Sequence, residues 1–162
     1  RYLLLPCLNI VVMCIYNHIQ NWIQSIGTPT KKLDGHSVCP YAKKAEWDLV
    51  ICKEDVLANC FTFVSNKHLK KEVTVFIFDD DLSKFQLKYL CELLNSEFSK
   101  YVFYPDHRKR KTYVGEAISN NGKYNVVLAQ RRKELEKART KLKETNYYSF
   151  WNKKYLKEIL NA

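Results

Sequence analysis

The segment 72–78, EVTVFIF, restricts the fold more than any other part of this 162-residue chain. Its β-branched and aromatic residues are typical of a buried strand, because such side chains pack well on a pleated sheet. The segment 47–52, WDLVIC, predicts a second strand, and a helix over about 55–66 is expected between the two. This order predicts a β-α-β unit near the centre of the protein.

A further helix is expected directly after the strand at 72–78. Asp79, Asp80 and Asp81 are good N-cap and first-turn residues, and the apolar residues that follow recur at helical spacing. These apolar residues are Leu82, Phe85, Leu90, Leu93, Leu94 and Phe98. An alternative for the acidic run is a Mg²⁺ site at a strand end, but the helix cap is the preferred interpretation.

The N-terminal part of the chain predicts two more helices. Apolar residues at helical spacing indicate an amphipathic helix over 14–26, which would end in a left-handed cap at Gly27. A loop rich in turn formers follows. Pro40 is then expected to open a short helix, since proline suits the first helical turn.

The C-terminal part mixes strands and helices. The segment 100–105 predicts a strand, and the Asn-Asn-Gly run at 120–122 predicts the turn of a β-hairpin. Helices are expected over about 129–144 and 150–160, where apolar residues again follow helical spacing.

The chain is long enough for one domain with a substantial core. Its alternating helices and strands predict an α+β (or α/β) fold in which helices cover a single mixed sheet. A ferredoxin-like or related split β-α-β arrangement is preferred. Residues 13–162 are expected to form this one domain, with a basic helical C-terminal part.

Residues 1–12 precede Met13, the one methionine in the chain. They are interpreted either as a reading-frame extension or disordered N-terminus, or as a genuine first strand or helix turn. The apolar run there is interrupted by Pro6 and Asn9 and is shorter than the roughly 20 residues of a membrane-spanning helix. No signal-peptide cleavage site follows it. We therefore expect no association with membranes.

The six cysteines form no Cys-x-x-Cys pair, and several lie within apolar stretches, as small core side chains do. This pattern favours reduced thiols. Reduced thiols in turn favour a cytoplasmic location.

The net charge of +10 is concentrated toward the C-terminus. Residues 1–99 hold 11 basic and 11 acidic side chains, whereas residues 100–162 hold 16 and 6. Polyanions would be attracted to this part of the surface. A nucleic-acid-binding module would contact phosphates through Arg108, Lys109, Arg110, Lys111, Arg131, Arg132 and Lys133. The alternative is a solvated helical face, because glutamates interrupt the basic run at 130–143.

The stretch 34–42, DGHSVCPYA, is the best candidate for a functional site. Cys39 would lie at a helix start, where unpaired backbone N–H groups and the positive helix end lower the pKa of a thiol. An exposed Cys39 would then be reactive. The alternative is a plain loop-to-helix junction with a buried cysteine.

A small-molecule pocket is therefore predicted around this stretch. Its candidate catalytic residues are His36, Cys39, Tyr41, Asp106 and His107. His36 and Cys39 supply at most two of the three or four ligands of a zinc site. No metal is assigned on this basis, and the sequence specifies no cofactor.

Three motifs resemble those of a known family. Trp22, the VCPYA run at 38–42 and the FYP run at 103–105 follow one another along the chain. They resemble the tryptophan, Leu-Cys-Pro-Phe-Ala and Phe-His-Pro motifs of a bacterial domain family of unknown function. The resemblance covers roughly residues 22–145, with Tyr104 in place of the family's histidine. It implies that the Cys-Pro pair is a fixed feature of such folds, and it implies no particular activity.

Two functions follow from these patterns. The preferred hypothesis is a small ligand-binding or enzyme-like domain with its pocket near Cys39, and the alternative is a nucleic-acid-binding module. Leu128, Leu135 and Leu142 stand at heptad spacing and would suit a partner helix. A homo-oligomer formed through the C-terminal helices is therefore also expected.

Overall fold

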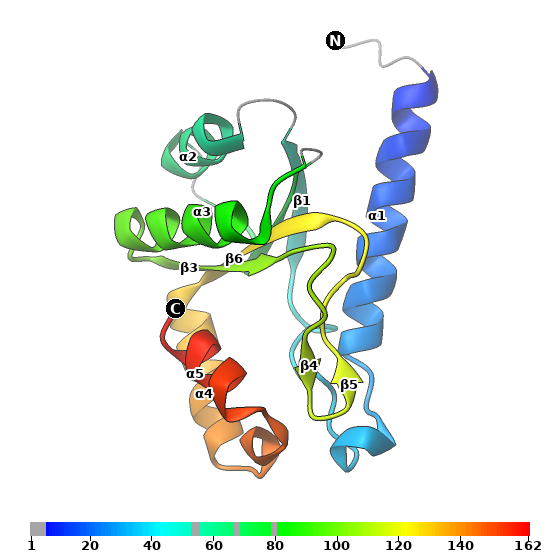
Figure 1. Cartoon of the computed structure of the whole chain (residues 1–162), viewed down its shortest axis with the longest axis vertical. Coiled ribbons are helices and arrows are strands. Elements are labelled where there is room, and N and C mark those ends of the chain that lie inside the picture. Colours follow the sequence, from blue (N-terminus) through cyan, green and yellow to red (C-terminus); the bar gives the residue numbers. More distant parts are fainter. Residues whose placement is uncertain (1–5, 53–55, 67–68, 79–80) are drawn as a thin grey trace.

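The computed structural model describes residues 6–52, 56–66, 69–78 and 81–162, and Figure 1 shows how their helices and strands are arranged. The chain begins with α1 (Pro6–Ile26), a 3₁₀ turn (Lys31–Leu33), β1 (Trp47–Cys52), α2 (Val56–Asn66), β2 (Val73–Phe78) and α3 (Lys84–Glu97). It continues with β3 (Tyr101–Asp106), β4 (Tyr113–Val114), β5 (Ala117–Ile118), β6 (Asn125–Arg131), α4 (Arg132–Lys143), a 3₁₀ turn (Tyr147–Phe150) and α5 (Lys153–Leu160).

The main sheet has four strands in the order β1-β2-β6-β3. β1 and β2 are parallel, whereas β6 lies between β2 and β3 and is antiparallel to both. The unit β2-α3-β3 is thus a split β-α-β unit, with β6 inserted between its two strands. The predicted α+β class, the single mixed sheet and the split arrangement are confirmed. The element order differs from β-α-β-β-α-β, so the fold is related to the ferredoxin-like type rather than an example of it.

β2 is the most buried strand, as the EVTVFIF segment predicts. Phe76 and Phe78 pack in one apolar cluster with residues of α2 and α3, while Val75 and Ile77 pack in another with residues of α1. Successive side chains of a strand point to opposite faces of the sheet. Helices cover both faces of β2 (Figure 1). The side chains on both faces must therefore be apolar, which is why the strand is a continuous apolar run.

The helix cap predicted at the acidic run is wrong. α3 begins after Ser83, whose hydroxyl accepts from the Gln86 N–H while the Gln86 side chain accepts from the Ser83 N–H. This reciprocal capping box satisfies two N–H groups at once, which one carboxylate further upstream cannot do. Asp81 is exposed and pairs with Arg108, and Asp79 and Asp80 lie outside the described residues.

No helix opens at Pro40, which contradicts the sequence prediction. Residues 40–45 form consecutive turns, in which Ala42 N–H donates to the Cys39 carbonyl and Lys44 N–H to the Tyr41 carbonyl. So short a stretch before β1 does not offset the cost of nucleating a helix.

The left-handed cap predicted at Gly27 is also absent. The missing side chain of Gly27 admits Lys43, whose Cγ would lie 2.7 Å from an added Cβ.

The hairpin predicted around 120–122 is also wrong. The hairpin that forms is smaller and joins β4 to β5 through Gly115, which has a φ of 56°. β6 pairs with β2 and β3 instead. The side chain of Asn121 is buried against Asp106, so its role is to close the long connection between β3 and β6.

The C-terminal helices pack less tightly than the others. No residue of α4 or α5 is fully buried. Leu128 belongs to β6 and not to a helix, so the expected heptad stripe does not exist as one helical face. The expected homo-oligomer stays a prediction.

The first helix extends further toward the N-terminus than the pattern indicated. α1 starts at Pro6, so residues 6–12 continue the helix that was expected from residue 14. Ile10 and Met13 are exposed, and burial against the sheet begins at Ile15. Within the part of the chain that the structure describes, no helix is long and apolar enough to cross a membrane.

Candidate ligand-binding cavity

A cavity of about 320 Å³ lies where α1, the segment 38–45, the main sheet and the C-terminal helices meet. Its walls are mostly apolar, and many of the side chains that line it are aromatic. These include Trp22, Tyr41, Tyr104, Tyr148, Trp151 and Tyr155. Figure 1 shows the C-terminal end of α1 and the α4-α5 pair on opposite sides of the β4-β5 hairpin. α4 and α5 pack loosely and border this space, which is partly open to solvent.

Cys39 lines the cavity but does not have the reactive thiol that a helix start would produce. The residue is half-buried, and burial raises the pKa of its thiol, although the backbone N–H groups of Tyr41 and Ala42 act in the opposite direction. With no helix at Pro40, there is no helix end to favour a thiolate. The low thiol pKa expected from the sequence is therefore wrong. Cys14, Cys52, Cys60 and Cys91 are free thiols as well.

We expect iodoacetamide at pH 7.5 to alkylate Cys14 at least ten times faster than Cys39. The thiolate is the nucleophile, and a raised pKa lowers its concentration. Cys14 is the internal reference because it is exposed. Peptide fragmentation mass spectrometry over a time course measures both rates. Equal or faster labelling of Cys39 would show that its thiol is activated after all.

Asp106 is the one carboxyl among the predicted site residues, and it lines the same cavity at the end of β3. The residue is 9% exposed, and its Oδ2 accepts from the Asn121 backbone N–H at 2.9 Å and from Asn121 Nδ2 at 2.7 Å. Burial raises the pKa of the Asp106 carboxyl to about 6, although these hydrogen bonds and the nearby Arg110 lower it. Asp106 can therefore take up or release a proton near neutral pH.

The two predicted histidines do not line the cavity. His36 Nε2 pairs with Asn146 Oδ1 at 2.7 Å, and its ring lies against Tyr147. His107 is buried, donates from Nε2 to the Leu82 carbonyl at 2.8 Å and accepts the Lys109 N–H at Nδ1. Both histidines hold neighbouring segments together, so the structure brings together Cys39, Tyr41 and Asp106 but not the full predicted set.

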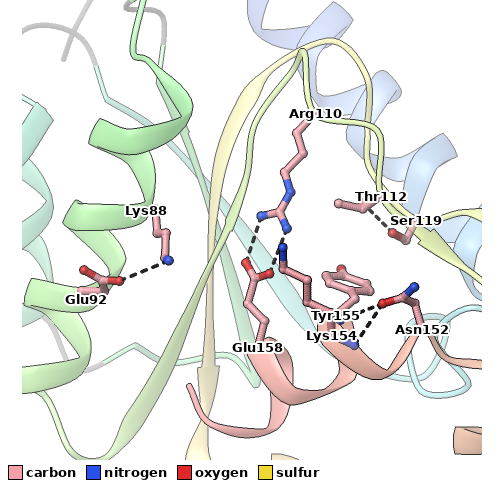
Figure 2. A network of polar contacts seen from close by, with 9 residues as sticks. All are labelled: Lys88, Glu92, Arg110, Thr112, Ser119, Asn152, Lys154, Tyr155 and Glu158. Atoms are coloured by element: carbon pink, nitrogen blue, oxygen red, sulfur yellow. Dashed lines mark hydrogen bonds and ion pairs between the residues drawn. The ribbon is translucent and has the colours of Figure 1, made fainter.

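Polar contacts position Tyr155 at the cavity wall, as Figure 2 shows. Arg110 donates to both carboxylate oxygens of Glu158 at 2.9 Å, which ties α5 to the segment after β3. Asn152 Oδ1 caps α5 by accepting from the Lys154 and Tyr155 N–H groups. Burial raises the pKa of the Tyr155 hydroxyl, which therefore stays protonated at neutral pH.

All four arginines of the predicted nucleic-acid-binding set make contacts within the fold. Arg108 pairs with Asp81, and Arg110 pairs with Glu158. Arg131 donates to the carbonyl oxygens of residues 69 and 70, and Arg132 to those of residues 99 and 101. Lys109, Lys111 and Lys133 are exposed and make no side-chain ion pair with any described residue. Nucleic-acid binding stays a prediction, with fewer free cations than the sequence indicated.

Sequence reasoning missed the C-terminal wall of the cavity. Leu135 and Leu142 line it from α4, together with Arg139 between them. Trp151 and Tyr155 stack with ring centroids 5.4 Å apart and line it from the last helical segment. The signal was present as helical spacing of apolar residues, but this spacing was assigned to the core or to a partner helix.

Among the described residues, no three His, Cys, Asp or Glu side chains are grouped so that they would hold a metal ion. A scan against protein-family models finds no match for the chain, and no curated protein and no solved structure is significantly similar to it. The resemblance to the bacterial domain family stays a prediction. Of the residues on which it rests, Trp22, 38–42, Tyr104 and Pro105 line this one cavity, whereas Phe103 packs in the apolar cluster with residues of α2 and α3.

Proposed function

We propose that the protein is a ligand-binding domain that takes a small, largely apolar organic molecule into this cavity. The observation that carries the proposal is the mostly apolar, aromatic-lined space of about 320 Å³ beside Cys39 and Pro40. Binding sites for small molecules are typically concave, start at about 300 Å³, and combine apolar walls with a few polar groups. The cavity has these properties.

The packing around the cavity supports the same conclusion. Apolar surface that is left open to solvent in one contiguous groove commonly marks a binding site. Here the aliphatic side chains of Leu135 and Leu142 remain half-buried beside the cavity. The indole Nε1 of Trp151 is buried beside the Tyr147 hydroxyl, which is its side-chain partner. A bound molecule would cover the apolar walls.

Asp106 gives the cavity a group with acid-base chemistry. Its carboxyl, with a pKa raised to about 6 by burial, would act as a general acid or base toward a bound molecule that carries an exchangeable proton. The Thr112 and Ser119 hydroxyls line the cavity nearby and are joined by a hydrogen bond of 2.6 Å (Figure 2). These polar groups would orient the molecule, while the aromatic rings supply contact area.

Binding of the neutral fluorophore N-phenyl-1-naphthylamine tests this proposal. We expect saturable fluorescence enhancement with the wild-type protein. The Ala138→Phe variant should reduce the affinity at least tenfold, because Ala138 lines the cavity and the larger ring would occupy its space. Fluorescence titration at constant protein concentration measures both affinities.

Thr140→Phe is the matched control for this experiment. Thr140 lies two residues further along α4, is exposed, and is not part of the cavity wall. This variant should bind the fluorophore as the wild type does. Absence of binding to the wild type, or equal loss in both variants, would contradict the proposal, provided that circular dichroism shows all three proteins folded.

A further inference from the structure

We propose that the ligand is a small organic carboxylate with an aromatic or otherwise apolar body, and that Arg139 binds its carboxylate group. This inference rests on the proposed binding function and specifies the chemical class of the ligand. It starts from the electrostatics of α4, where Arg139 is half-buried in the cavity wall between Leu135 and Leu142.

The Arg139 guanidinium is held in place by neutral oxygens. Its Nη2 donates to the Tyr104 hydroxyl and, at 2.6 Å, to the Ile159 carbonyl oxygen. Tyr104 in turn donates to the same carbonyl at 3.1 Å. No carboxylate of the described residues lies within 4.0 Å of Arg139, in contrast to Arg108 and Arg110, which have acidic partners. Among the described residues, Arg139 is thus a cation that is held in place but has no carboxylate within ion-pair distance.

The remaining donors of Arg139 suit a carboxylate. A guanidinium has five N–H groups in a planar fork, and only those of Nη2 have acceptors among the described residues. The Nε–H and Nη1 N–H groups point to different sides of the guanidinium, and each is available to donate singly to a carboxylate oxygen. A carboxylate at this position would also offset the cost of removing an unpaired charge from water.

The surroundings of Arg139 favour a singly charged, ring-bearing anion. The hydroxyls of Tyr104 and Tyr148 lie close enough to Arg139 for its charge to lower their pKa values, although burial raises both pKa values by more. Burial raises the pKa of Tyr104 to about 12, so its hydroxyl remains a neutral partner. Arg131 also lines the cavity and, like Arg139, donates through Nη2 to two neutral oxygens, in its case the carbonyls of residues 69 and 70. Arg139 differs in that one of its acceptors is a ring hydroxyl of the cavity wall, that of Tyr104, so a carboxylate on an apolar, ring-bearing body would suit it.

A pair of matched probes tests the inference. 2-Naphthoate and 2-naphthamide have the same ring system and nearly the same shape, but only the first is an anion. We expect the wild-type protein to bind 2-naphthoate about tenfold more tightly, because charge-assisted hydrogen bonds are stronger than neutral ones. Isothermal titration calorimetry at pH 7.5 measures both affinities. Equal affinities in the wild type would overturn the inference without any variant.

Variants then assign the preference to Arg139. Arg139→Gln keeps a donor for the Ile159 carbonyl but removes the charge, and we expect it to bind both probes equally. Arg139→Lys should retain part of the preference. Lys137→Gln removes a charge from an exposed position of the same helix and should leave the preference unchanged. A full preference in Arg139→Gln, or its loss in Lys137→Gln, would contradict the assignment.

The two proposals fail in different ways. If neither naphthalene probe nor N-phenyl-1-naphthylamine binds to the wild type, the binding function itself is wrong. If the neutral probes bind and 2-naphthoate binds no more tightly than 2-naphthamide, the cavity binds molecules but Arg139 does not select an anion.

Discussion

The Asp106→Asn variant is expected to be more stable than the wild type by up to about 3 kcal/mol at pH 7.5 and to show almost no difference at pH 4. Burial raises the pKa of this carboxyl from its ordinary value of 3.8 to about 6, and a change of that size corresponds to about 3 kcal/mol. An asparagine has no charge to desolvate. Its side-chain oxygen still accepts the two hydrogen bonds from Asn121 that Oδ2 accepts in the wild type.

The sign follows from proton binding in the two states. Between about pH 4 and pH 6, the folded wild type retains a proton on Asp106 that the unfolded chain has lost, so stability falls as the pH rises through this window. Above about pH 6 Asp106 is deprotonated in both the folded and the unfolded state, and the cost of its buried charge no longer changes with pH.

Urea unfolding from pH 4 to pH 8 measures the free energy of unfolding of the wild type and the variant. Asp48→Asn, at an exposed position on β1, is the control and should lack the effect. A difference between Asp106→Asn and wild type that does not grow with pH would refute the prediction.

Asn121→Ala is expected to destabilise the protein by about 3 kcal/mol at pH 7.5. Asn121 is 8% exposed, and its Nδ2 donates to Asp106 at 2.7 Å and to the Tyr124 carbonyl at 2.9 Å. Its Oδ1 accepts the N–H groups of Lys123 and Tyr124. Truncation removes one of the two hydrogen bonds to Asp106 Oδ2 and leaves the part-buried backbone groups of residues 123 and 124 without these partners; each such group costs about 1–3 kcal/mol unless water or backbone movement compensates it.

The neighbouring Asn120 provides a matched control for this variant. Its side chain accepts one long hydrogen bond of 3.4 Å from the Thr112 N–H, so Asn120→Ala should cost less than about 1 kcal/mol. The loss in Asn121→Ala should also be larger at pH 8 than at pH 4, because the Asn121 side chain favours the charged form of Asp106. Urea unfolding of both variants at the two pH values measures these losses of stability. Equal losses for Asn121→Ala and Asn120→Ala would contradict the prediction.

The periodic elements of the fold were predictable from the sequence, and the junctions between them were not. The strand at 47–52 matches β1 residue for residue, and 72–78 and 100–105 match β2 and β3 to within one residue. Hydrophobic patterns of this length indicate which side chains are buried, and their period distinguishes a strand from a helix. The turn signals were misleading because proline and the Asn-Gly pair each occur in more than one kind of turn. Pro40 opens a turn and no helix, and the Asn-Gly pair at 121–122 closes a connection and no hairpin.

The candidate site was predicted only in part, for a related reason. Cys39, Tyr41 and Asp106 meet at one cavity, as the pocket hypothesis required, but their chemistry differs from the expectation. The pKa of a thiol or carboxyl depends on burial and on neighbouring dipoles, and both are set by contacts between distant segments. His36 and His107 have the residue type of catalytic groups, but each is occupied by a hydrogen bond to a distant segment.

What this sequence determined by itself is the long helices, the strands of the main sheet and the mixed α+β class, because hydrophobic periodicity and residue propensity act over neighbouring residues. The tertiary structure alone decided that β6 lies between β2 and β3, and that α4 and α5 border a cavity. It also decided that Arg139 has no acidic partner among the described residues while Arg110 has one. Strand order, cavities and charge pairing depend on which distant segments meet, and no local pattern in the chain encodes that.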